Sequence, residues 1–223
     1  MPTPTSAFRV AAGCACVSAI TTLPIHLLDF PSGTFEERLA LRNNHLYLAR
    51  FAIVAVHVCL VVVSMFGVFL ARRRTAPALT TLGFLGYVFF ASVELMRQSF
   101  AFFAVNRSWR EAYAAPGATE STRATMSALL DAWPGINDAL FHGFIFGFTV
   151  GTACYAAVLL RGNSYERAVG WVFAGWSLMN AVGFLSGIVP KVPELPAFLP
   201  VTVQPLGRVL IGVWLWKRGS KEA

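Results

Sequence analysis

The stretch LGFLGYVFFASVELMRQSFAFF, residues 82–103, decides the fold class, because it is apolar over the length of a transmembrane helix and yet carries Glu94 and Arg97. About 20 helical residues cross a hydrocarbon core of about 30 Å. The whole chain is 56% hydrophobic and 13% charged, whereas soluble domains average about 45–50% apolar and about 25% charged residues. The stretch therefore predicts one helix of a membrane protein.

Five other stretches have comparable length and apolarity. The predicted spans cover about residues 10–28, 48–70, 78–104, 138–160, 168–189 and 199–216. The first run is too long for a cleaved signal peptide, so we interpret it as a retained helix. We predict an all-α fold in which six transmembrane helices form one bundle and a single domain over residues 1–223.

Two of the predicted connections carry local signals. Between the first two spans, Thr34 and Glu37 have the spacing of a capping box, which predicts a short helix on the membrane surface. Residues 106–137 contain the stretches YAAPGATEST and WPGIND. Their proline, glycine and threonine content predicts a loop with one helical turn, and this loop would be the longest connection.

Lysine and arginine are distributed unevenly between alternate connections, and cytoplasmic connections retain basic residues. If the N-terminus is cytoplasmic, the inner segments hold nine basic and two acidic residues, whereas the outer segments hold seven basic and eight acidic residues. The run ARRR at residues 71–74 is the strongest single marker, so we expect both termini in the cytoplasm. The net charge of +7 does not indicate nucleic-acid binding, because the basic residues form no patch interleaved with polar and aromatic side chains.

Polar residues inside the predicted spans fall in the half that faces away from the cytoplasm, and on most helices they recur along one side. Lipid cannot satisfy such groups, so they should face the bundle interior or water. We predict a polar pocket that opens outward and binds a small polar or amphipathic ligand. Its candidate ligand-binding residues are His26, His57, Glu94, Arg97, Asp138, His142, Asn180, Gln204 and Arg208.

Glu94 admits two interpretations. It could pair with Arg97 one turn away, or with Arg208 on the last span, and serve only to fix the helix register. Alternatively, the carboxylate and the guanidinium groups line the pocket and hold a ligand or a proton. Ionisable groups within a membrane are costly and are functional candidates for that reason.

His57 and His142 raise an enzymatic alternative. Two facing histidines on different helices could hold a b-type haem, or His142 could form a proton relay with Asp138 for acid-base chemistry on a lipid-like substrate. A hydrogen-bonded structural histidine is the third option. The chain contains no HxxxH or HExxH metal motif, no GxSxG motif and no phosphate-binding glycine loop.

We therefore expect a noncatalytic protein with a ligand-binding, accessory or sensory role. The sequence assigns no cofactor and no metal. The expected partners are membrane lipid and the pocket ligand, and no feature specifies an oligomeric state.

Glycines at GxxxG spacing predict close contacts between helices, because they let two backbones approach. Gly143, Gly147 and Gly151 have this spacing in the fourth span, and Gly183 and Gly187 have it in the fifth. We interpret both motifs as packing features.

The order of elements resembles a bacterial six-helix membrane family that is catalogued as domain of unknown function 4386. The resemblance covers roughly residues 46–216 and is poorest over the first span and residues 29–45. It is carried by LGFLGYVFFASVELM, DALFHGFIFGFTVGTACYAAVLLRG, WVFAGWSLMNAVGFLSGIVP and LPVTVQPLGRVLIGVWLW. The family implies six helices in the bacterial cytoplasmic (inner) membrane, and it implies no activity and no site residues.

Overall fold

The computed structural model describes residues 4–28, 33–186 and 198–221, and every regular element in these ranges is helical. The long helices are α1 (Pro4–Leu27), α3 (His45–Arg72), α4 (Pro77–Ser99), α6 (Glu120–Leu159), α7 (Ser164–Ser186) and α8 (Phe198–Lys221). The short ones are α2 (Phe35–Ala40), the 3-10 turn η1 (Leu41–Asn43), the π-helical segment η2 (Phe100–Trp109) and α5 (Arg110–Ala114). The all-α prediction is confirmed.

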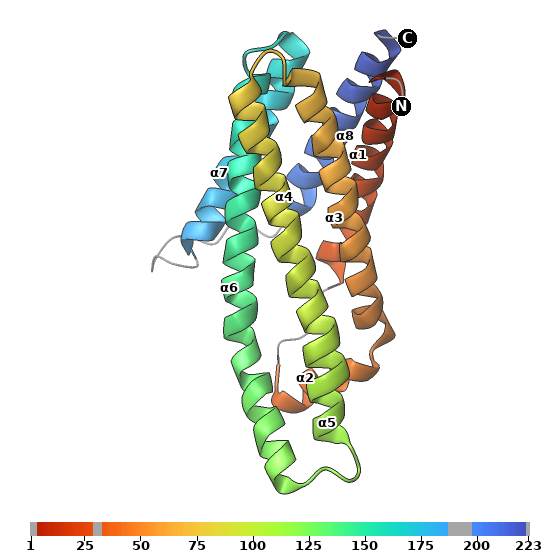
Figure 1. The fold of residues 1–223 in the computed structure, drawn as a ribbon, viewed down its shortest axis with the longest axis vertical. Coiled ribbons are helices and arrows are strands. Elements are labelled where there is room, and N and C mark those ends of the chain that lie inside the picture. Colours follow the sequence, from red (N-terminus) through yellow and green to blue (C-terminus); the bar gives the residue numbers. More distant parts are fainter. Residues whose placement is uncertain (1–3, 29–32, 187–197, 222–223) are drawn as a thin grey trace.

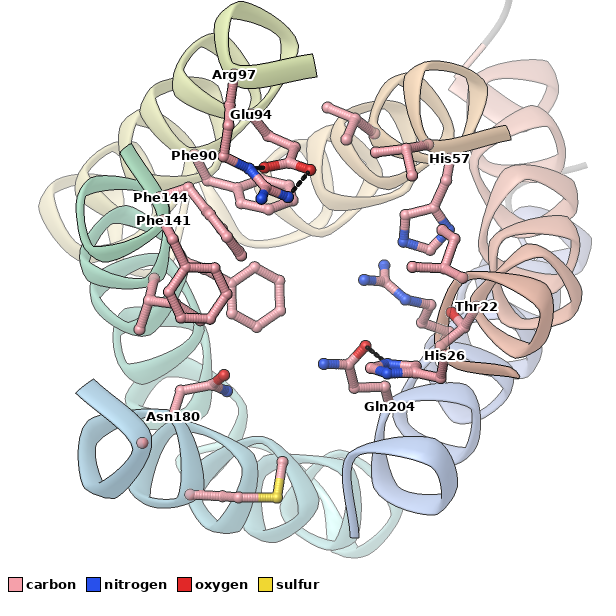
Figure 2. Close-up of a pocket in the computed structure, with 18 of the residues that line it drawn as sticks. Thr22, His26, His57, Phe90, Glu94, Arg97, Phe141, Phe144, Asn180 and Gln204 are labelled. Carbon is pink, nitrogen blue, oxygen red and sulfur yellow. Dashed lines mark hydrogen bonds and ion pairs between the residues drawn. The ribbon is translucent and has the colours of Figure 1, made fainter. Parts of the chain in front are cut away.

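The six long helices form a closed ring, which Figure 2 shows in a view along its interior. Each helix packs against the next in the order α1, α3, α4, α6, α7 and α8, and α8 returns to pack along α1. Both chain ends lie at the same end of the molecule as the α3–α4 and α6–α7 turns (Figure 1). The ring therefore surrounds an interior that side chains from all six helices can reach.

Five helices are long and apolar enough to cross a membrane: Thr5–Leu27, His45–Arg72, Pro77–Ala114, Glu120–Leu159 and Ser164–Leu185. The 24-residue α8 is not among these five. Gln204, Arg208 and the basic residues in its last turns lower its hydropathy. It nevertheless completes the ring.

One carboxylate ties together the end that holds both termini. Glu166 on α7 is 4% exposed and forms ion pairs with Arg72 of α3 and with Arg218 of α8, the latter at 3.9 Å. The indole Nε1 of Trp214 donates to the same carboxylate at 3.1 Å. Three ring helices therefore meet at Glu166, in the segment that carries the predicted excess of basic residues.

Helices α4 and α6 approach closely where their glycines face each other. A Cβ atom added to Gly86 would lie 2.7 Å from the backbone nitrogen of Gly151 and 2.8 Å from the carbonyl oxygen of Gly147. The predicted glycine-mediated contact is therefore confirmed at Gly147 and Gly151. At Gly183 no close helix contact is seen, since an added Cβ would meet no atom of the described residues within 4 Å, and Gly187 lies outside the described residues.

The predicted loop at residues 106–137 is wrong. The chain continues as one helical path from Pro77 through η2 to Ala114, and α6 already begins at Glu120. Only residues 115–119 connect the two arms, so Pro116 and Gly117 supply the turn that the composition indicates. At 40 residues, α6 is about 60 Å long. We call residues 100–137 the distal hairpin, since they lie at the end of the molecule opposite to the termini (Figure 1).

The second proline of that region, Pro134, lies inside α6. Proline in a helix removes one backbone hydrogen bond and disfavours the turn before it. Here the adjacent Trp133 stacks on Phe100 of η2, with ring centroids 5.5 Å apart and planes 12° from parallel. Packing between the arms of the hairpin outweighs the local helix-breaking preference.

The capping box at Thr34 and Glu37 is confirmed. Glu37 N donates to Thr34 Oγ1 at 3.3 Å, and Thr34 N donates to Glu37 Oε2 at 2.8 Å. The resulting α2 is held to the distal hairpin, because Arg38 Nη2 donates to Asp131 Oδ1 of α6 at 3.1 Å. Its location at a membrane surface stays a prediction.

Candidate functional site

The ring encloses a cavity of about 430 Å³ that is lined by side chains from all six long helices (Figure 2). The cavity brings together seven of the nine predicted site residues, and they are His26, His57, Glu94, Arg97, Asn180, Gln204 and Arg208. These seven residues come from α1, α3, α4, α7 and α8. The structure therefore brings the polar sides of these helices to one pocket, and ligand binding by this set stays a prediction.

The cavity has two chemically different sides. Phe90 of α4 and Phe141, Phe144 and Phe148 of α6 form what we call the aromatic wall. Phe90 lies 5.7 Å from Phe144 and 5.1 Å from Phe148, measured between ring centroids. Facing them is what we call the polar wall, made by Thr22, His26, His57, Gln204 and Arg208 of α1, α3 and α8. Figure 2 shows the labelled members of the two walls on opposite sides of the interior.

Glu94 is held by Arg97 on the same helix. The Nε and Nη2 atoms of Arg97 donate to the two carboxylate oxygens at 2.8 Å each, and Gln98 Nε2 adds a third bond at 2.7 Å. A remaining donor, Arg97 Nη1, reaches Asn137 Oδ1 of α6 at 3.0 Å. Of the two partners that the sequence left open for Glu94, the structure pairs it with Arg97, one turn away.

Arg208 is the most deeply buried charged group of the cavity, with 1% of its surface exposed. Its guanidinium carbon lies 5.3 Å from the ring centroid of Trp176, a side chain with no exposed surface. Within the part of the chain that the structure describes, neither Nε nor Nη1 of Arg208 has a hydrogen-bond acceptor. Arg208 thus lines the cavity as a buried cation with unused donors.

The two cavity histidines have neighbours on the polar wall. His26 Nε2 donates to Gln204 Oε1 at 3.4 Å and so connects α1 to α8. His57 Nδ1 is hydrogen-bonded to Thr21 Oγ1 at 2.8 Å and connects α3 to α1. These bonds fix both imidazole rings against the wall.

Asp138 and His142 are not among the residues that line this cavity, and their part in ligand binding stays a prediction. Asp138 is exposed, and His142 Nδ1 donates to its backbone carbonyl at 2.7 Å. The ring of His142 instead packs near Phe184, with centroids 5.7 Å apart. His142 lies about 100° around α6 from Phe141, which lines the cavity, so its ring points to a different side of the helix.

This placement bears on both enzymatic alternatives. His57 lines the cavity and His142 does not, so the two histidines are not brought together as axial ligands of a haem in this site. The alternative of an Asp138–His142 relay is not seen among the described residues, since His142 Nδ1 donates to the backbone carbonyl of Asp138. The described residues therefore assemble neither the haem ligand pair nor the relay in this cavity.

The aromatic wall is the part of the site that the predicted residue set lacks. Phe141, Phe144 and Phe148 recur at steps of three and four, which places them on one side of a helix. That spacing is a usable signal. It has the same form as ordinary core packing, however, so the pattern alone does not distinguish a cavity wall from a filled interior.

Comparisons of the chain with protein-family models, with curated proteins and with solved structures found no match. The resemblance to domain of unknown function 4386 stays a prediction. The geometry of the cavity is therefore the observation that bears on function.

Proposed function

We propose that the protein is a noncatalytic integral membrane protein whose cavity binds a small amphipathic ligand in an accessory or sensory role. The observation that carries this proposal is the opposition of the aromatic wall to the polar wall across one cavity of about 430 Å³. Binding sites for small molecules are mostly apolar concavities with a few placed polar groups. This cavity has that composition.

The outer surface of the ring supports the membrane location. Large apolar side chains are exposed on it at several helices, among them Leu82 at 50%, Leu85 at 56%, Trp171 at 69% and Leu178 at 67%. Soluble monomers rarely expose extended apolar surfaces. Together with five helices of sufficient length and apolarity and α8 as the sixth, this surface favours six spans in the cytoplasmic membrane.

The proposed orientation places both termini in the cytoplasm and the cavity mouth on the opposite side. Arg72, Arg73, Arg74, Arg161 and Arg167 cluster near the α3–α4 and α6–α7 turns, at the end that holds the termini. Basic residues of this kind are retained on the cytoplasmic side. The distal hairpin then projects outward.

The size of the cavity sets the size of the ligand. A dry cavity of about 150 Å³ accepts one benzene molecule, so a cavity about three times larger holds roughly 15–20 non-hydrogen atoms. A medium-length single acyl chain with a small head group falls in this range. A complete two-chain phospholipid is too large.

The polar groups of the cavity are better suited to holding a ligand than to chemistry. Glu94 already accepts three hydrogen bonds from Arg97 and Gln98, so most of the acceptor sites of its carboxylate are occupied within the protein. His26 and His57 are each held by a hydrogen bond to a neighbouring helix. A noncatalytic role fits this arrangement.

The test is native mass spectrometry of the full chain released from a neutral detergent, with and without a block in the cavity. Gly183 lines the cavity, and an added Cβ there would meet no atom within 4 Å. We expect the wild type to carry a copurifying small molecule that Gly183→Leu excludes. Gly175→Leu is the matched control, because Gly175 lies on the same helix with equally open space but outside the cavity lining. Loss of the adduct in both variants, or its persistence in Gly183→Leu, would contradict a ligand cavity.

A further inference from the structure

We infer that the cavity selects an amphipathic anion, whose carboxylate or phosphate group binds Arg208 while its apolar part lies along the aromatic wall. This inference rests on the proposed ligand-binding function and adds the charge and orientation of the ligand. It assigns to Arg208 the role of the head-group contact.

The Arg208 side chain is buried and lacks hydrogen-bond acceptors among the described residues. A charged group that is removed from water is costly unless it is paired and hydrogen-bonded. Only 1% of the surface of Arg208 is exposed, and two of its donor nitrogens have no acceptor among the described residues. Arginine cannot discard its proton at physiological pH. The natural partner of this group is therefore an anion that enters the cavity.

Arg97 lines the same cavity but differs from Arg208 in its hydrogen bonds. Arg97 places three of its nitrogens on Glu94 and Asn137 and is thereby satisfied within the protein. Glu94 in turn has its own partners, so it does not compensate Arg208. The Arg97 guanidinium is therefore committed to structure, whereas the Arg208 guanidinium is left for a ligand.

The described lining of the cavity contains more basic than acidic side chains. Three arginines line the cavity, Arg50, Arg97 and Arg208, and Glu94 is the one carboxylate among the described lining residues. Because Glu94 is paired with Arg97, the excess positive charge lies at Arg208, with which no carboxylate of the described lining residues pairs. In a poorly solvated interior such an excess favours an anion over a neutral or cationic guest.

A further hydrogen-bond donor, Gln204, lies near Arg208 on α8. Gln204 lies four residues before Arg208 on α8, so the two side chains share one face of that helix. The Gln204 oxygen is occupied by His26, and its amide nitrogen points into the interior in Figure 2. An anion at Arg208 can therefore accept hydrogen bonds from two side chains of α8, as carboxylate and phosphate groups require.

The geometry also orients the ligand. Trp176 lies against Arg208 and restrains the guanidinium from one side. Phe141 and Phe144 of the aromatic wall lie across the cavity from His26 and His57 of the polar wall (Figure 2). A single-chain amphiphile satisfies both sides at once, with its head at α8 and its tail against α4 and α6.

The experiment compares head groups on one tail. The full-length wild-type protein in a neutral detergent is titrated with dodecanoate, dodecyl phosphate, dodecanol and dodecyltrimethylammonium, and bound adducts are counted by native mass spectrometry. We expect one or both anions to bind about tenfold more tightly than dodecanol, as a hydrogen bond to a charged group predicts. The ammonium amphiphile should bind more weakly than dodecanol. The tighter anion identifies the head group as carboxylate or phosphate.

Three variants assign the selectivity to Arg208. Arg208→Gln should remove the preference for anions, and Arg208→Lys should retain part of it because the charge stays. Arg110→Gln is the matched control, since Arg110 is also a buried arginine, 5% exposed, but lies in the distal hairpin outside the cavity. It should bind anions like the wild type.

The outcomes separate this inference from the proposed function. If dodecanol and the anions bind equally well, and Gly183→Leu blocks all of them, the cavity binds amphiphiles without charge selection and the inference is wrong. Anion selectivity that survives in Arg208→Gln would also refute it. If none of the four amphiphiles binds the wild type, both the inference and the proposed function fail.

Discussion

Arg97 Nε and Nη2 each donate to one carboxylate oxygen of Glu94 at 2.8 Å, and the two residues lie one turn apart on α4. Glu94 is 5% exposed, so this bidentate pair is shielded from water on the wall of the cavity. The pair is satisfied within one helix. Arg208 on α8 lines the same cavity and has no comparable partner among the described residues, so the two arginines should respond differently to mutation.

Removal of one member of the Glu94–Arg97 pair should destabilise the protein. Arg97→Met leaves the Glu94 carboxylate buried with Gln98 as its remaining partner, and breaking a buried pair costs about 3–5 kcal/mol in soluble proteins. The double variant Glu94→Gln, Arg97→Met should recover most of this loss. Thermal unfolding in detergent measures both effects. Unfolding temperatures of both single variants close to that of the wild type would show that the pair contributes nothing to stability.

Neutralising Arg208 should have the opposite effect on ligand-free protein. Arg208→Met removes two buried donors that lack acceptors in the part of the chain that the structure describes, and each unsatisfied donor costs about 1–3 kcal/mol. The free energy of unfolding should therefore rise or stay constant after delipidation. The same thermal unfolding series gives the answer, and a large drop for Arg208→Met would mean that the guanidinium is paired within the fold.

The contact between α4 and α6 should be sensitive to a single methyl group. Gly86→Ala places a Cβ 2.7 Å from the backbone nitrogen of Gly151, and backbone atoms cannot yield as a flexible side chain can. We expect a loss of about 1–3 kcal/mol from overpacking. Gly143→Ala on α6 is the control, because its Cβ would lie 3.6 Å from Val93, an ordinary contact. Equal stability of the two variants would exclude a tight crossing at Gly86.

The proposed orientation can be tested by cysteine labelling in intact cells. In a variant with its four native cysteines replaced, Glu111→Cys in the distal hairpin should react with an impermeant maleimide. Arg73→Cys should react only after the cells are permeabilised. Both positions are exposed, so access to the reagent and not burial decides the result. The reverse labelling pattern would invert the protein and place the cavity mouth in the cytoplasm.

The sequence could predict the convergence of polar residues because two simple constraints act together. Steps of three and four residues place Thr22 with His26, and Gln204 with Arg208, on one side of a helix. An apolar surrounding then forces these sides inward. The same constraints were insufficient on α6, where Asp138 and His142 compete with Phe141 and Phe144 for the interior face, and the phenylalanines occupy it.

The distal hairpin could not be predicted because its stability is not local. Pro134 and Gly135 favour a break in the chain, and the sequence contains no comparably strong local signal in the other direction. The helix forms because Trp133 stacks on Phe100, a residue that is distant in sequence. The pairing of Glu94 with Arg97 instead of Arg208 is likewise decided by the distance between α4 and α8, which no spacing along the chain specifies.

The closure of the ring by α8 against α1 has a consequence for the order of assembly. These two helices meet through small residues, since Gly212 lies so close to Cys16 that an added Cβ would be 2.7 Å from its sulfur. During synthesis the other five ring helices emerge before α8, so this face of α1 stays uncovered until α8 has been made. The cavity therefore acquires Gln204 and Arg208, its anion-binding side, only when the last helix docks against the first.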